Sequence, residues 1–196
     1  MQVKMIKMLI DNGADIHART SNEDSVLHIA IQGHPHVAVV KLLVDSGCNP
    51  AVCNSDGQTP LHIAAIEGHT SIVKYMLSLD IPLPPDILLS AARVRPMQVE
   101  MIKILIDKGA DVHTRTSGGD SVLDVAMSCY QDDLDRLQAH WRHLHDQDFL
   151  KAVEILDHSG CDPAVCNPSG KMRIHVAVAT RCIDIRQQLL ALYRAT

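Results

Sequence analysis

Apolar positions in this chain recur at the three-to-four-residue spacing of amphipathic helices. Ile72, Val73, Met76 and Leu77 follow this spacing and predict one helix. A shorter apolar run over 61–66 lies ahead of it, with Thr59 and Pro60 as a start signal and Gly68 as a stop signal. The pattern predicts a pair of short helices joined by a tight connection, and therefore an all-α unit.

Internal repeats organise the whole sequence. Residues 1–32 match residues 97–128 without a gap, and 21 of those 32 positions are identical. A second block, residues 47–54, returns at 160–167, so the offset between the copies grows from 96 to 113 residues. The second copy therefore carries an insertion of about 17 residues, at about 128–149. Self-similarity of this kind is typical of repeat architectures.

A shorter period of 34 residues separates His28 from His62. The unit with Thr-Pro-Leu-His-Ile-Ala-Ala at 59–65 and Gly-His at 68–69 resembles the ankyrin repeat. Gly-Ala-Asp at 13–15 and again at 109–111 is similar to the turn that ends such a repeat. The resemblance implies an all-α ankyrin-repeat solenoid of stacked helix-turn-helix units with one elongated helical hairpin at the insertion. It divides a single domain, 1–196, into a half unit, 1–19, and units 20–53, 54–81, 82–115, 116–166 and 167–196.

The resemblance also assigns a structural role to three histidines, His28, His62 and His175. In ankyrin repeats this residue bonds backbone groups and the neighbouring hydroxyl, so neither a metal nor a catalytic role is expected for it. Asp124 stands at the equivalent place of the inserted unit. We expect Asp124 to accept hydrogen bonds there, in a less regular repeat.

The cysteines predict reduced thiols rather than a metal site. Cys48 and Cys161 replace the alanine of the Gly-Ala-Asp turn, a small buried position. Cys53 and Cys166 fall in the connecting loop, and a Cys-x4-Cys spacing is not that of a usual zinc knuckle. No metal and no cofactor is expected.

The insertion is the least generic segment. Tyr130, Leu134, Leu137, Trp141 and Leu144 follow one another at helical spacing, and Gly and Pro are absent between Asp120 and Ser159. We expect a helical hairpin in which both helices gain about two turns, with the reversal within 138–147. Trp141 either packs between the longer helices or serves as a partner-binding anchor.

Charge and composition exclude several partners. The net charge is -5, so nucleic acid is not the expected partner, because phosphate binding needs a basic surface. No segment has the ~18 unbroken apolar residues of a membrane span, and residues 1–13 contain no signal-peptide apolar region. The expected location is cytoplasmic or nuclear. Aromatic residues make up only 3%, which suits thin helical layers of aliphatic side chains.

The resemblance implies a non-catalytic scaffold that binds another protein on a concave face and on the tips of its hairpins. The tips are expected at 17–24, 53–58, 114–120 and 166–171. The partner-binding candidates are Arg19, Asn22, Glu23, Ile31, Gln32, Asp56, Gln58, Ile66, Glu67, Tyr130 and Trp141.

Two other hypotheses remain open. An ankyrin-fold enzyme or small-molecule binder would use a pocket beside 128–149, and its residues to test are Tyr130, Asp133, Trp141 and His145. A non-binding spacer within a longer array would use neither surface.

The first residues correspond to the second helix of a unit, because Met1 matches Met97. One helix face is then expected to lack its usual cover. Either further repeats or a domain N-terminal to residue 1 supply that cover, or a homo-oligomer contact does.

Overall fold

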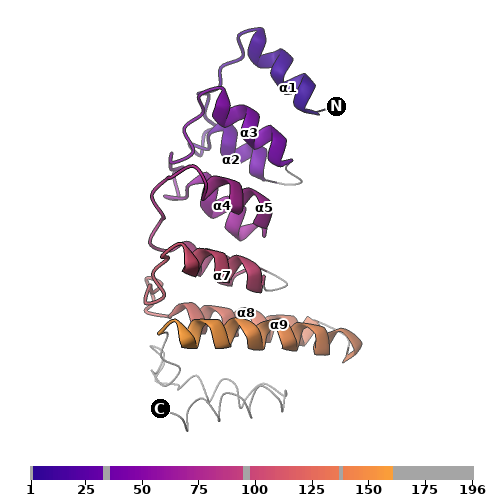
Figure 1. The fold of residues 1–196 in the computed structure, drawn as a ribbon, viewed down its shortest axis with the longest axis vertical. Helices are drawn as coiled ribbons and strands as arrows, with labels where there is room; N and C mark the ends of the chain where they lie inside the picture. Colours follow the sequence, from indigo (N-terminus) through magenta and orange to yellow (C-terminus); the bar gives the residue numbers. More distant parts are fainter. Residues whose placement is uncertain (1, 33–35, 95–97, 137–138, 161–196) are drawn as a thin grey trace. The chain divides into compact units, whose positions relative to one another are not determined.

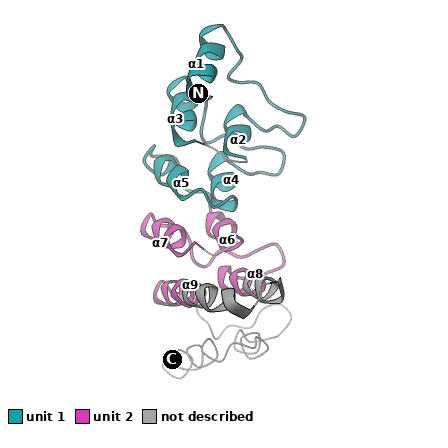
Figure 2. Ribbon diagram, turned by 90° about the vertical axis from the view of Figure 1, so that its right-hand side faces the viewer, with its two compact units in different colours: residues 1–84 teal, residues 85–196 magenta. Residues whose placement is uncertain are grey.

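A computed structural model describes residues 2–32, 36–94, 98–136 and 139–160 of the chain, with the side chains of 2, 130–147 and 157 left out. In these residues the secondary structure is helical, and β-pairing is confined to two isolated bridges, Arg19 with Ser25 and Arg115 with Ser121. The predicted all-α architecture is confirmed for these residues. The chain divides into two compact units, Met1–Pro84 and Pro85–Thr196 (Figure 1 and Figure 2).

The N-terminal unit is a stack of helical pairs. Its described helices are α1 (Gln2–Asp11), α2 (Val26–Ile31), α3 (Val37–Asp45), α4 (Pro60–Ile66) and α5 (Thr70–Met76). Each first helix packs against its own second helix, α2 on α3 and α4 on α5. Successive repeats stack like on like: α2 lies against α4, and α3 lies between α1 and α5 (Figure 2). This arrangement gives one layer of first helices and one of second helices.

The sequence explains where the first helices begin. Thr59 is the N-cap of α4, and its hydroxyl accepts a hydrogen bond from the His62 backbone N–H at 3.4 Å. The His62 side chain accepts in return from the Thr59 N–H through Nδ1, at 3.0 Å. Ser25 and His28 repeat this exchange at the start of α2. The predicted structural role of His28 and His62 is therefore confirmed, while His175 lies outside the described residues.

The C-terminal unit contains, among its described residues, α6 (Ile87–Ala92), α7 (Val99–Asp107), α8 (Val122–Arg136) and α9 (Ala139–His158). Here α6 packs on α7 and on α8, and α9 packs on α7 and α8. At the start of α8, Ser121 and Asp124 take the places of Thr59 and His62. The Asp124 carboxylate accepts hydrogen bonds from both the N–H (2.9 Å) and the hydroxyl (2.7 Å) of Ser121. Asp124 thus accepts the hydrogen bonds expected of it.

The insertion forms the elongated hairpin that was predicted. The helix α8 has 15 residues and α9 has 20, against 6 for α2 and 9 for α3. The change from α8 to α9 falls between Arg136 and Ala139, at the first edge of the predicted range 138–147. No glycine or proline marks the break, so the sequence offers no local signal for its place.

Each unit has an aliphatic core with small residues at the helix contacts. Leu27, Leu61, Ala64 and Ala65 are fully buried in the N-terminal unit, and the C-terminal unit buries Phe149 of α9. Ile31 is also fully buried, so the expectation that it faces an open groove is wrong. Its side chain shares the inner face of α2 with Leu27 and His28, four and three residues away, and joins the core.

Candidate partner-binding surface

The tips of two successive repeats in the N-terminal unit are tied together by hydrogen bonds. The Ser55 N–H donates to the Asn22 carbonyl at 3.0 Å, and the Asn54 side-chain amide donates to the Asp24 carboxylate at 2.8 Å. The Arg19 guanidinium donates to the Cys53 carbonyl at 3.2 Å. These three bonds join residues about one repeat apart, so the two tips form a single framework. We call residues 19–24 and 53–58 the tip surface.

Four of the predicted partner-binding residues, Arg19, Asn22, Glu23 and Asp56, are exposed on this framework. Arg19 and Glu23 form an ion pair at 3.3 Å, with side chains 36% and 60% exposed. A pair this exposed adds little stability. Its charges are available to a partner, since they stand on a backbone that the bonds between the tips already fix.

Glu23 adopts a backbone conformation that favours glycine. Its φ is +60°, and the equivalent tip positions are Gly57 at +73° and Gly119 at +86°. For an L residue this region costs roughly 1–2 kcal/mol. The equivalent position of the C-terminal unit is Gly119, and the Arg115 guanidinium donates to the Gly119 carbonyl at 2.9 Å. Strained backbone of this kind clusters at functional positions.

Beneath the tip surface, His28 connects the two repeats. Its Nδ1 accepts from the Ser25 N–H, so Nε2 carries the proton and donates to the Gln58 carbonyl at 2.9 Å. Burial lowers the pKa of His28 below its ordinary value of 6.5, while the bond to Gln58 opposes part of that shift. The neutral ring is therefore the form that holds the tips in register. Gln58 itself is half-buried.

The remaining predicted residues lie in two other places. Gln32 and Glu67 are the C-cap residues of α2 and α4, and both are exposed, whereas Ile66 is half-buried. Because α2 and α4 pack side by side, these ends belong to one face of the first-helix layer. Tyr130 lies in α8 and Trp141 in α9, but their side chains are outside the described residues, as are those of Asp133 and His145.

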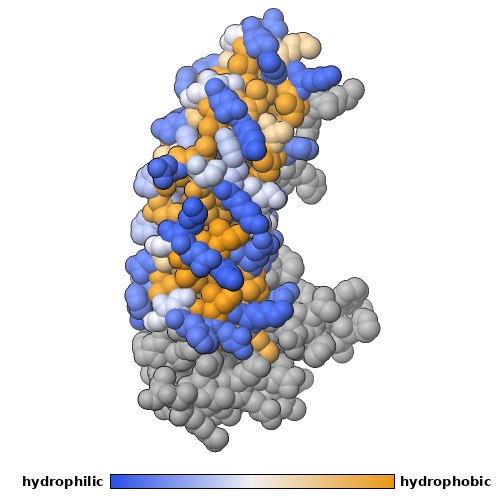
Figure 3. All heavy atoms as spheres, viewed as in Figure 1, coloured by the Kyte–Doolittle hydropathy of each residue, from blue (hydrophilic) through white to orange (hydrophobic). Residues whose placement is uncertain are grey.

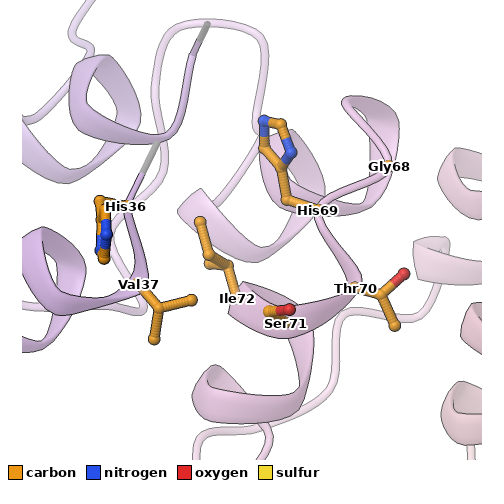
Figure 4. A pocket seen from close by; sticks show the side chains of 7 residues that line it. All are labelled: His36, Val37, Gly68, His69, Thr70, Ser71 and Ile72. Carbon is orange, nitrogen blue, oxygen red and sulfur yellow. The ribbon is translucent and has the colours of Figure 1, made fainter. Parts of the chain in front are cut away.

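A hollow of about 460 Å³ lies at the opposite ends of the repeats, where the helices of each pair connect. It contains His36 and His69, the N-cap residues of α3 and α5 (Figure 4). The Nε2 atom of His69 is buried without a hydrogen-bond partner. Sequence reasoning did not single out this hollow. Within the described part of the chain, no group of three or more His, Cys, Asp or Glu side chains is placed to hold a metal ion.

The described cysteines are free thiols. Cys48 is 6% exposed, and its Sγ lies 3.4 Å from the Ile16 carbonyl, so the small buried site predicted for it is confirmed. Burial raises the pKa of the Cys48 thiol. Cys53 is exposed at the tip surface, while Cys161 and Cys166 lie outside the described residues. As to membranes, the described helices include none with the length and hydropathy of a bilayer span.

Short capped helix pairs, stacked like on like and joined by hydrogen-bonded tips, define a helical repeat protein. The family model described as ankyrin repeats, in three copies, matches residues 2–86. Residues 2–86, less than half of the chain, therefore carry the sequence pattern of ankyrin repeats. Ankyrin repeats generally mediate protein–protein interactions.

Two solved structures illustrate the likeness. The ankyrin repeat domain of Bcl-3, described as a unique member of the IkappaB protein family, aligns with a TM-score of 0.67 and 21% identity over 96% of this chain and 77% of its own. An ankyrin repeat domain from Acinetobacter baumannii AYE aligns with a TM-score of 0.72 and 18% identity, over 97% of this chain and 92% of its own. At such identities the likeness is one of fold. Curated proteins gave no match to the sequence.

Proposed function

We propose that this chain is a non-catalytic scaffold that binds another protein through the tip surface and the adjoining face of the first helices. The observation that carries the proposal is the pair of tips itself. Exposed charges, Glu23 and Asp56 among them, stand on a framework that hydrogen bonds hold before any partner arrives. Such pre-organisation reduces the entropy lost on binding.

Glu23 supports the proposal independently. Glycine would satisfy the backbone at this position, as it does in two other tips, yet the chain carries a strained glutamate with an exposed carboxylate. Nothing in the fold of the tip requires a charge there, because the Arg115 tip closes without one. A partner with a basic or hydrogen-bond-donating group facing Glu23 would account for the choice.

The test is a quantitative capture experiment with charge-matched variants. The double variant Glu23→Lys, Asp56→Lys changes only the tip surface, and Asp107→Lys, Glu154→Lys makes the same charge change on exposed positions of α7 and α9. The wild-type and control chains should capture the same partner from a native extract. The tip variant should bind that partner at least about tenfold more weakly, which is a loss of about 1.4 kcal/mol of binding free energy. Equal capture by all three chains would refute binding through the tip surface. If no chain captured a protein, the chain would be a non-binding spacer instead.

The alternative, an enzyme or small-molecule binder beside 128–149, stays a prediction. The hollow at His36 and His69 lies in the N-terminal unit, as does a second one of about 460 Å³ beside α1. Location in the cytoplasm or nucleus also stays a prediction.

A further inference from the structure

His28 is a buried histidine that links the two tips of the tip surface. Its side chain has no exposed area, in contrast to the hydrophilic residues that are visible at the surface in Figure 3. Its Nδ1 lies 3.1 Å from the Ser25 backbone nitrogen and 2.8 Å from the Ser25 hydroxyl, and its Nε2 lies 2.9 Å from the Gln58 carbonyl oxygen. Ser25 directly follows the first tip and Gln58 ends the second. Each ring nitrogen therefore holds one of the two tips.

Only the neutral ring fits these bonds. The Ser25 backbone N–H donates to Nδ1, so Nδ1 keeps its lone pair, and Nε2 carries the proton that it donates to Gln58. A second proton, on Nδ1, would point at the Ser25 N–H, so that two donors would face each other. The Ser25 hydroxyl is able to turn and accept that proton, but the backbone N–H is fixed. Protonation of His28 therefore breaks the bond between the ring and the residue that caps α2.

The surroundings of His28 disfavour the charged ring. Burial has the largest effect on the His28 pKa and lowers it, while the bond to Gln58 and the Asp24 carboxylate act in the opposite direction. The charges of Arg19 on the first tip and His62 on α4 add to the lowering. The other charged residues of the two tips and of α3 are exposed, and they are Glu23, Asp56, Lys41 and Asp45. The closed tips therefore hold His28 in its neutral form.

We propose that protonation of His28 opens the tip surface and releases the partner bound there. The tips are joined by the Ser55 N–H, which donates to the Asn22 carbonyl at 3.0 Å, and by the Asn54 amide, which donates to the Asp24 carboxylate at 2.8 Å. These bonds need the two tips in register, and the ring of His28 spans both. Loss of the ring's bonds therefore separates the exposed charges that the tips present together. Release of a partner rests on the proposed function, whereas the opening rests on the bonds of the chain itself.

Uptake of a single proton sets the size of the effect. In the open tip the ring is hydrated, so its pKa lies near the ordinary value of 6.5, above that of the closed tip. Each pH unit below 6.5 then raises the ratio of open to closed tips by at most about tenfold. Between about pH 7.5 and about pH 5.5 we expect this ratio to rise by at least about threefold, with about tenfold as the upper limit.

Hydrogen exchange in the full chain measures the opening without any partner. After correction for the intrinsic rate at each pH, the Ser55 amide should exchange at least about threefold faster at the lower pH, while amides within α5 stay protected. His28→Gln should abolish this increase, because an amide side chain accepts and donates but does not titrate. His17→Gln removes an exposed histidine close to the tip surface and should keep the increase. In the wild-type chain, NMR of the ring should show His28 taking up its proton over the same pH range.

The partner recovered in the capture experiment tests the release: the wild-type and His17→Gln chains should lose it at the lower pH, and His28→Gln should retain it. Exchange at Ser55 that does not change with pH, or that rises equally in His28→Gln, would overturn the opening. So would a rise shared by the amides of α5, or a His28 ring that stays neutral while Ser55 opens. Opening with equal capture at both pH values would overturn the release. Opening with no partner captured at either pH would count against the proposed function and would support the opening.

Discussion

Leu9 and Leu105 offer a matched pair within one molecule, because both follow Ile-Lys-x in equivalent second helices. We predict that the same truncation to alanine has very different costs at the two positions. Leu105 is fully buried and Leu9 is 55% exposed, so only the first leaves a closed cavity. Leu105→Ala should lower the free energy of unfolding by roughly 3 kcal/mol, the sum of lost transfer energy and cavity formation.

Leu9→Ala should cost about 1 kcal/mol or less. Complete burial of a leucine side chain contributes roughly 1.5–3 kcal/mol, and about half of this side chain is already in water. No cavity term is added, because the hollow beside α1 is open to solvent. The difference between the two variants should therefore be about 2 kcal/mol, well above the error of a denaturation experiment.

Urea denaturation of the full chain measures both costs. Far-UV circular dichroism follows all helices, and the fluorescence of Trp141, which lies in α9, reports the C-terminal unit. Both signals are needed because repeat proteins can unfold in steps. Leu105→Ala should shift the fluorescence transition strongly, and Leu9→Ala should barely move it. Equal costs at the two positions would show that Leu9 is covered in solution, and would refute the open hollow.

Three further predictions test the tips and the thiols. In urea denaturation, Glu23→Gly should stabilise the chain by about 0.5–1 kcal/mol, because the strain that positive φ causes in an L residue outweighs the extra entropy that glycine loses on folding. Gly119→Glu should destabilise the chain for the same reason. Shifts of the same sign for the two variants would contradict this reasoning. The free energy of unfolding should fall as the pH drops below 6.5, because His28 then binds a proton in the unfolded chain but accepts one in the folded chain only at lower pH. His28→Gln should flatten this dependence of stability on pH. An unchanged dependence in the variant would exclude His28 as the cause. In thiol titration, Cys53→Ala should remove a fast-reacting thiol, because Cys53 is exposed. Cys48→Ala should leave the fast-reacting thiols unchanged, because Cys48 is buried and its pKa is raised. The reverse result would contradict the burial of Cys48.

The sequence was most informative where local chemistry decides structure. Thr59, Pro60 and His62 specify a helix start through bonds within four residues, so the cap could be predicted before any packing was known. The internal repeat extended that inference to Ser25 and His28. The length difference between the copies predicted the long hairpin in the same way, since added residues without glycine or proline extend helices.

The misassigned residue was Ile31, and the reason is the composition of α2. Five of the six residues in Val-Leu-His-Ile-Ala-Ile are apolar, so the helical period cannot select an inner face. Packing against α3 and α4 selects it: Ile31 is buried, while Ile29 is nearly half exposed. The position of the reversal after Arg136 was unpredictable for a similar reason, because no residue near it favours a turn.

The bonds between the tips could not be read from the sequence either. They join Arg19 to Cys53, Asn22 to Ser55 and Asp24 to Asn54, and each depends on the stacking of two repeats. The strain at Glu23, in contrast, left a trace in the sequence. Aligning the copies places it opposite Gly57 and Gly119, a substitution that a turn with positive φ makes unusual.

Comparison of the two copies also argues that the hollow beside α1 is maintained rather than incidental. Positions outside its lining differ freely in charge between the copies, as Lys4 does from Glu100 and Asn12 from Lys108. Inside the lining, the differences at Ile16 and Ile29 are between branched aliphatic residues. The lining thus stays apolar in both copies, as the packing of α6 against α7 and α8 requires in the second copy.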